Sequence, residues 1–535
     1  MNASRSSRTG ASPLGRFLLW VHGLVPLPSV EYLARRPRLL ISLAGFSAFA
    51  GCLLYAAVNG IPRPSVHDEF SYLLAGDTFA SGRLTNPTHP MWQHFETFHV
   101  LQRPSYASKY PPGQGIVLAI GQILGHPIVG VWLSVAFMAA GISWMLYQWV
   151  PPRWALLGSM LAVVQVGFPT YWAQSYWGGA LAALGGALVF GALRAGATDP
   201  RLLHGILFGL GAMILAITRP LEGALAGLAA AAALAWLVGR AAREERARLL
   251  RAVIVPAAAL IVATLGTTAL YNRAVTGDPM RMPHQVYSQA YHLGAVFPWQ
   301  EPSPIVDYRH DAIRDFKLKW SIERHEQQRQ HFLAALLFKF LRLEGFFLGP
   351  GLLGLVMVPW LIRDRWLLLA GTVSALVLAS VLLTLSALPH YAAPAAGPLL
   401  VLNLEGLRRL NGVRTDKVDG RRLVTLILLA YLPYLALRNP HVVGAAMSDF
   451  GDRRQEVLDS LESTDGNDLV IVVYGNDHNF HMEWVYNRAV IDSADVVWAR
   501  DMSPEDNREL IRYFDDRRVW LLEVDDTARL EPYRD

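Results

Sequence analysis

An acidic pair, Asp68-Glu69, lies in a polar stretch that follows the first long hydrophobic run of the chain. A carboxylate close to low-dielectric lipid can act as a general base that removes a proton from an acceptor hydroxyl. Neighbouring side chains on a helix diverge by about 100°, so only one of the two acids is expected to face a reaction centre. The alternative interpretation is a pair of solvated loop acids beside a membrane.

Three basic residues could neutralise an anion near this pair. Lys109 begins the segment KYPPGQG, Arg103 precedes it, and Arg219 lies in TRPLEG between two later hydrophobic runs. Charge-assisted hydrogen bonds from such side chains suit a phosphate group. A lysine that extends to the headgroup layer would equally explain Lys109, and Arg219 could be the structural partner of Glu222.

Aromatic and histidine side chains that could bind a sugar or a phosphate recur beside the hydrophobic runs. They are Tyr72, Tyr176 and Trp177, with the pair His390-Tyr391 at a helix junction. Stacking aromatic rings suit the faces of sugars. Tyrosine and tryptophan also form the ordinary belt at a membrane surface, and a packed histidine would explain His390 as well.

A metal site is an alternative for the histidines of the first polar stretch. His89, His94 and His99 could join Asp68 or Glu69 around a divalent ion. Their spacing of five residues places no two of them on one helical face, and no recognised ligand motif is present. We therefore expect no metal and no other cofactor.

Composition makes the chain a membrane protein. Its 535 residues are 53% hydrophobic with a mean hydropathy of +0.26, and several apolar runs approach the ~20 residues that a spanning helix needs. The single cysteine excludes a disulfide within the chain. The net charge of +5 does not indicate nucleic-acid binding, because the arginines cluster in short loops between hydrophobic runs, where they act as topology signals.

The hydrophobic runs predict an α-helical polytopic protein with about 11 transmembrane helices in residues 39–437. The basic segments around 240–251, 363–365 and 408–422 all fall on the cytoplasmic side when the runs are counted in order. Two large loops, 61–112 and 272–331, then lie outside, and the first is expected to contain interfacial helices. The expected spans are 39–59, 127–150, 154–171, 178–193, 202–217, 221–238, 252–271, 332–361, 366–388, 392–407 and 423–437, with 113–125 a short or interfacial helix.

The two ends of the chain differ from its membrane part. Residues 1–38 are basic and lack the apolar core of a signal peptide, which predicts a cytoplasmic leader. Residues 438–535 alternate strand-like runs with a helical pattern that begins at Ser503, which predicts a small α/β domain on the extracytoplasmic side. Its GNDHNFHMEW loop is interpreted as a solvated surface loop, with acceptor recognition as the alternative.

The motifs resemble those of the membrane GT-C superfamily of glycosyltransferases. HDE-x-x-Y at 67–72, KYPPGQ at 109–114 and LPHY at 388–391 with Pro394 and Pro398 are similar, in order and sidedness, to motifs of protein O-mannosyltransferases and lipid A aminoarabinose transferases. The resemblance implies an inverting transfer in which Asp68 is the catalytic base and Glu69 supports it. His67 and the Gly113-Gln114 pair depart from the pattern of that family.

Sugar transfer from a polyprenyl-phosphate donor to an acceptor hydroxyl on the extracytoplasmic face is therefore the expected function. The partners would be that donor, membrane lipid, and a glycan, lipid or protein acceptor, without nucleic acid. A bacterial inner membrane is favoured, with the N-terminus inside. A lipid or glycan transporter or flippase, and a non-catalytic assembly partner, are the alternatives, although clean spans with charge at one face are not typical of transporters.

Overall fold

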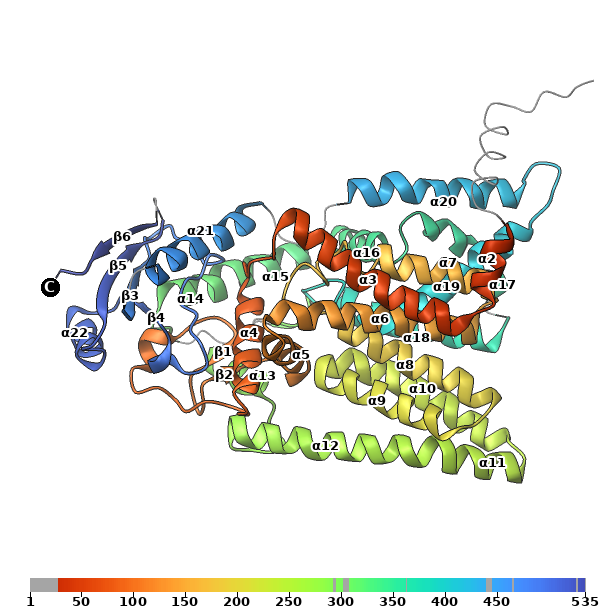
Figure 1. The fold of residues 1–535 in the computed structure, drawn as a ribbon, viewed down its shortest axis with the longest axis horizontal. Coiled ribbons are helices and arrows are strands. Elements are labelled where there is room, and N and C mark those ends of the chain that lie inside the picture. The colour runs from red at the N-terminus through yellow and green to blue at the C-terminus, as the bar shows by residue number, and fades with distance from the viewer. Residues whose placement is uncertain are drawn as a thin grey trace, which may run out of the picture.

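The computed structural model describes residues 27–291, 295–301, 307–361, 363–438, 445–463, 466–525 and 528–534. Most of the predicted leader, residues 1–26, lies outside this part of the chain. The described residues form a long bundle of helices that carries shorter helices and a small sheet at one end (Figure 1).

Seven helices of the described residues are long and apolar enough to cross a membrane, which makes the chain a multi-pass membrane protein. They are α3 (Pro37–Asn59), α6 (Pro127–Trp149), α8 (Ala180–Thr198), α10 (Pro220–Arg240), α12 (Val255–Thr276) with the segment from Arg243 before it, α18 (Arg365–Leu383) and α20 (Gly420–Leu437).

Four further predicted spans are helical but shorter. They are α7 (Pro152–Val164), α9 (Leu202–Thr218), α16 (Phe332–Phe347) continuing through η4 (Gly349–Met357) into α17 (Val358–Leu361), and α19 (Ala396–Gly412). The expected short helix at 113–125 is α5 (Pro112–Ile123). Each predicted span thus contains a helix, although α7 ends at Val164, before the predicted end at residue 171, and the total of 11 membrane crossings stays a prediction.

Small residues let the bundle helices approach closely. A Cβ at Gly130 of α6 would lie 1.9 Å from the carbonyl oxygen of Val117 in α5, and one at Gly186 of α8 would lie 2.2 Å from that of Pro394. Neither distance is possible for a real side chain, so these contacts require glycine. The Gly130 contact holds α5, which begins at the second proline of KYPP, against the bundle.

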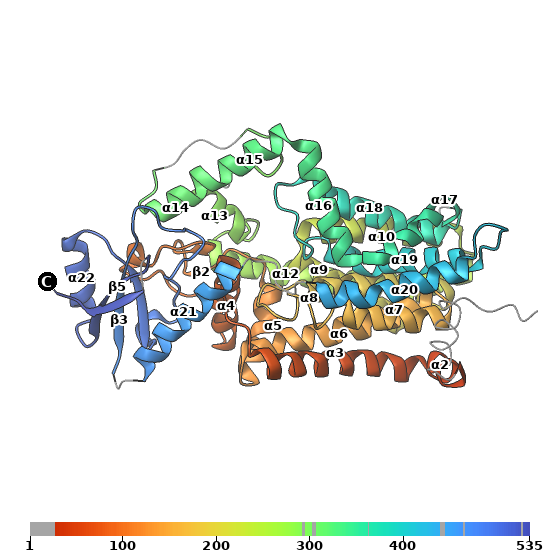
Figure 2. The same cartoon turned by 90° about the horizontal axis from the view of Figure 1, so that it is seen from above.

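The predicted inner and outer segments lie at opposite ends of the bundle (Figures 1 and 2). The basic loops surround α2 (Leu27–Ala34), α11 (Arg243–Leu249) and α17 at one end. At the other end lie α4 (His67–Ala80), α13 (Pro283–Tyr291), α14 (Asp311–Asp315), η3 (Phe316–Trp320) and α15 (Ser321–Gln330), beside the sheet. The relative sidedness inferred from the charges therefore matches the fold.

The C-terminal residues form a four-stranded sheet in the order β4-β3-β5-β6. Strands β3 (Asp468–Val473), β4 (Val496–Arg500) and β5 (Arg518–Glu523) are parallel, and β6 (Arg529–Pro532) is antiparallel to β5. Helix α21 (Ala445–Glu462) precedes β3 in the chain, and α22 (Pro504–Tyr513) connects β4 to β5. The α/β pattern agrees with the expectation, whereas the boundary at residue 438 stays a prediction.

The sheet and the first large loop share one hydrophobic core. Phe70 of α4 stacks on Tyr486 with ring centroids 4.3 Å apart, and Leu74 is buried in the same cluster. The apolar side of α4 therefore packs on the C-terminal segment. Interfacial placement of α4 stays a prediction, and this contact anchors the helix that carries Asp68.

Candidate active site

Glu69 fixes the first turn of α4. Its Oε2 accepts hydrogen bonds from the backbone N–H groups of Ser65 (2.9 Å) and Val66 (3.2 Å), and its Oε1 accepts one from Tyr176 (2.9 Å). The side chain is buried, and loss of hydration raises the pKa of Glu69 to about 7 against the opposing effect of these donors. With every oxygen engaged by backbone, Glu69 holds the start of the helix and faces no open space.

Asp68 is the acid that remains accessible. The hydroxyl of Tyr110 donates a hydrogen bond to its Oδ1, while Oδ2 lies 3.8 Å from Nε2 of His99. Its side chain is 20% exposed, whereas the Glu69 residue as a whole is 3% exposed. The expectation that adjacent acids diverge therefore holds in the fold, and Oδ2 accepts no hydrogen bond from the described residues.

His99 occupies a strained backbone conformation beside this carboxylate. Its φ of 64° lies in the left-handed region that few non-glycine residues adopt. Hydrogen bonds hold it there: its carbonyl accepts from Ser71 Oγ (2.6 Å) and Lys109 N (3.1 Å), and its N–H donates to the Tyr287 hydroxyl (3.0 Å). Burial, with the nearby lysines, lowers the pKa of His99 well below its ordinary value, so the ring is neutral.

Two buried lysines face one aromatic ring next to His99. The ammonium groups of Lys109 and Lys317 each lie 4.9 Å from the ring centroid of Tyr287. No carboxylate of the described residues lies within 4.0 Å of either nitrogen. Burial lowers the pKa of Lys109 to about 8, opposed by Asp68, and burial followed by Lys109 lowers that of Lys317 well below its ordinary value. The pair is a ready binding place for an anion.

A second wall of the site comes from the later helices. The guanidinium of Arg219, between α9 and α10, lies 4.5 Å from the ring centroid of Tyr391. Tyr72 stacks on Tyr110 at 4.4 Å and lines a small pocket with Arg219 and Trp177. His390 is buried against Trp177 at 5.0 Å, and its Nδ1 lies 3.0 Å from the Tyr171 hydroxyl.

Aromatic rings cover the opposite side. His67 stacks on Phe98 at 4.1 Å and meets Phe316 at 5.5 Å, while His481 of the GNDHNFHMEW loop lies 5.9 Å from His67 and 5.3 Å from Trp320. That loop therefore reaches the site, which corrects its interpretation as a solvated surface loop. The correction could not be read from the segment itself, because the contact is made across about 400 residues of chain.

The structure brings most of the predicted site residues together. Contacts place one group of them around one centre: Asp68, Lys109, Tyr72, Arg219, His390, Tyr391 and Trp177. Glu69 follows Asp68 in the first turn of α4. Tyr176 is adjacent but structural, because its N–H donates to Glu69 and its hydroxyl donates to Pro62 O. Arg103 is exposed over Trp92, 5.0 Å from the ring centroid, and no described contact joins it to Asp68.

Tyr110, Lys317, Tyr287 and His481 are among the residues of the site that were not predicted. Tyr110 lies in the KYPP segment, so the motif itself could have predicted it. Lys317 belongs to a polar helical pattern whose lysines look alike, since Lys319 is exposed and paired with Asp315 at 2.7 Å. Only the burial of Lys317 separates the two.

The three histidines considered for a metal do not converge. His89 Nε2 lies 2.7 Å from Asp492 Oδ1 and His94 Nδ1 lies 2.9 Å from the carbonyl of Arg500, so both connect the first large loop to the C-terminal segment. Across the described ranges, no three His, Cys, Asp or Glu side chains are grouped as metal ligands.

Fold and site together define a multi-pass helical membrane protein with an accessible carboxylate among cations and aromatic rings at one end of its bundle. No family model matches the chain, and no curated protein matches it.

Solved structures show similarity over most of the chain. ArnT from Cupriavidus metallidurans, a lipid A aminoarabinose transferase, is 13% identical over 91% of this chain and 93% of its own, with TM-scores of 0.48 in the apo state and 0.47 bound to undecaprenyl phosphate. An Archaeoglobus fulgidus oligosaccharyltransferase tethered with an acceptor peptide is 10% identical over 91% and 68%, with a TM-score of 0.42. Both are GT-C glycosyltransferases, the superfamily that the motifs resemble.

Proposed function

We propose that the protein is a glycosyltransferase that moves a sugar from a polyprenyl-phosphate donor to an acceptor hydroxyl at the extracytoplasmic face of a membrane. One observation carries this proposal: Asp68 Oδ2 is open at a centre flanked by Lys109 and Lys317 on one side and by Arg219 on the other. Such a centre pairs a proton acceptor with excess positive charge. A hydroxyl nucleophile and a phosphate leaving group need that combination.

The residues divide the reaction between them. Asp68 accepts the proton as the acceptor oxygen bonds to the anomeric carbon, and the bond from that carbon to the phosphate oxygen breaks. Tyr110 orients the carboxylate through its hydrogen bond to Oδ1, and Glu69 positions the helix turn. The cations take up the charge that develops on the departing phosphate.

The aromatic wall provides a surface for the sugar. Tyr72, Trp177 and Tyr391 lie beside Arg219, and His390 is held among them by Tyr171. This proposal assigns no role to Arg103, because its guanidinium lies over the ring of Trp92. The placement in a bacterial inner membrane, with the N-terminus inside and the C-terminus outside, belongs to the same proposal and rests on the distribution of basic loops.

The test is transfer by the purified full chain in liposomes, with Asp68→Asn as the variant. Loss of a general base lowers the rate about 10²–10⁴-fold. Because asparagine keeps the shape and still accepts the Tyr110 hydrogen bond, donor binding and thermal unfolding should stay near those of the unchanged protein.

Asp452→Asn is the matched control, since this exposed carboxylate pairs only with Arg63, at 3.0 Å, among the residues that the structure describes. It should transfer sugar normally. Full activity in Asp68→Asn contradicts the role of the carboxylate, and lipid translocation by a protein that transfers no sugar would favour the transporter alternative.

A further inference from the structure

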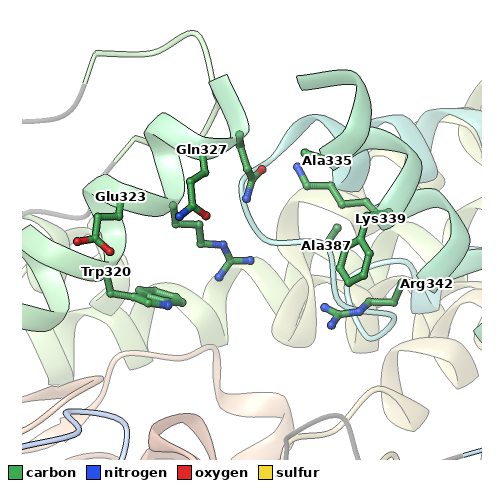
Figure 3. A pocket seen from close by; sticks show the side chains of 10 residues that line it. Trp320, Glu323, Gln327, Ala335, Lys339, Arg342 and Ala387 are labelled. Atoms are coloured by element: carbon green, nitrogen blue, oxygen red, sulfur yellow. The ribbon is translucent and has the colours of Figure 1, made fainter. Parts of the chain in front are cut away.

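A second cationic pocket lies outside the Asp68 centre, between α15, α16 and the loop after α18 (Figure 3). Its volume is about 370 Å³, which is ample for a phosphate group. Figure 3 shows Lys339 and Arg342 extending from α16 toward α15, which contributes Gln327 opposite them. The pocket is lined by Trp320, Glu323, Arg324, Gln327, Gln328, Ala335, Phe338, Lys339, Arg342 and Ala387.

Positive charge in this pocket is not neutralised by the protein. Arg324, Lys339 and Arg342 line it against a single carboxylate, that of Glu323, which is exposed. In the part of the chain that the structure describes, no carboxylate oxygen lies within 4.0 Å of a nitrogen of these three cations. A concave surface with three cations and little opposing charge attracts an anion.

Carbonyl groups hold two of the three cations in place, Arg324 and Lys339. Lys339 Nζ donates to the carbonyl oxygens of Leu382 (3.3 Å) and Thr384 (2.6 Å), and Arg324 donates to that of Leu385 (3.0 Å). An ammonium group has three donors and a guanidinium five, so both keep donors for a ligand. The Arg342 guanidinium lies 5.2 Å from the ring centroid of Phe338 and makes no described hydrogen bond. All of its N–H donors are therefore available to a ligand.

The pocket borders the surface expected to face lipid. Leu333, Leu337 and Leu341 of α16 are 77%, 57% and 53% exposed at a spacing of four residues, which is one face of the helix. Phe338, which lines the pocket, is 62% exposed beside them. An occupant with an anionic head and apolar chains would fit both surfaces at once, whereas a soluble anion would use only the cations.

We propose that this pocket, formed by Arg324, Lys339 and Arg342 beside the apolar face of α16, binds the phosphate headgroup of a membrane lipid. The pocket adjoins the Asp68 centre, because Trp320 lines the pocket, lies 5.0 Å from the Arg324 guanidinium and lies 5.3 Å from the ring of His481. The inference does not depend on sugar transfer.

Native mass spectrometry of the full chain in nanodiscs tests the site. The nanodiscs contain phosphatidylcholine with or without dioleoyl phosphatidic acid, and the variants are Arg342→Gln, Arg324→Gln and Arg324→Lys. Loss of a charged hydrogen-bond donor should weaken retention of phosphatidic acid by roughly tenfold or more in the glutamine variants, and Arg324→Lys should retain part of it.

Arg314→Gln is the matched control, because this arginine at the same end is already paired with Asp311 (2.6 Å) and Asp315 (3.2 Å). It should retain the lipid, and so should Asp68→Asn, which separates this site from the proposed chemistry. Equal retention by all variants would overturn the proposal. Tight binding of inorganic phosphate with no retained phosphatidic acid would overturn its assignment to a lipid.

Discussion

Replacement of Lys317 by methionine isolates the coupling between the two buried lysines. Each ammonium nitrogen lies 4.9 Å from the Tyr287 centroid, so the two are separated by no more than twice that distance, about 9.8 Å. At an effective dielectric constant of about 20, two positive charges at this separation repel by at least about 1.7 kcal/mol. That energy corresponds to slightly more than one pH unit in the titration of a partner.

The direction of the pH effect depends on which protonation state of the lysine binds the donor phosphate. A protonated lysine attracts phosphate, and burial lowers the pKa of Lys109 to about 8, so donor affinity should fall as the pH rises through this value. Lys109 lowers the pKa of Lys317, whereas the pKa of Lys109 itself is set by burial and opposed by Asp68. The midpoint of the affinity loss should therefore stay near pH 8 in Lys317→Met, whereas a charged Lys317 would move it by about one pH unit.

The assay is binding of a short polyprenyl phosphate to the purified full chain between about pH 7 and pH 10. The phosphate keeps a constant charge in this range because its second pKa is about 6. Lys319→Met is the control, since this lysine is two residues away, exposed and paired with Asp315. A midpoint that moves up by about one pH unit in Lys317→Met would refute this direction of coupling, and the same shift in Lys319→Met would show that the effect is not specific to the buried lysine.

Two further predictions concern the scaffold of the site. Glu69→Gln should lower the free energy of unfolding by about 2–4 kcal/mol, because an amide has one acceptor oxygen for the three backbone donors and leaves one or two of them unsatisfied. Thermal unfolding in detergent measures this loss, and an unchanged Tm would contradict the prediction. Gly130→Ala should force α5 and α6 apart, because the new Cβ would lie 1.9 Å from the carbonyl oxygen of Val117. Both Tm and yield should fall. Gly266→Ala is the control, because its Cβ would have open space around it, and this variant should fold normally.

Fold prediction from this sequence worked where local patterns carry the information. Apolar runs long enough to span lipid must be helical, because only a helix satisfies every backbone group within one segment. Basic loops then set the relative side of each run, and the structure gathers the predicted outer segments at one end. Asp68 and Lys109 could also be predicted from the sequence, because each lies next to the start of a helix. Asp68 lies in the first turn of α4, and Lys109 lies just before α5.

The tertiary structure decided which polar residues share a centre. Glu69 and Asp68 look alike in sequence, yet backbone donors from Ser65, Val66 and Tyr176 engage the first and leave the second open. Lys317 and His481 arrive from segments about 250 and 410 residues away from Asp68. Their burial depends on packing between separate parts of the chain, and neither residue type nor spacing encodes that packing.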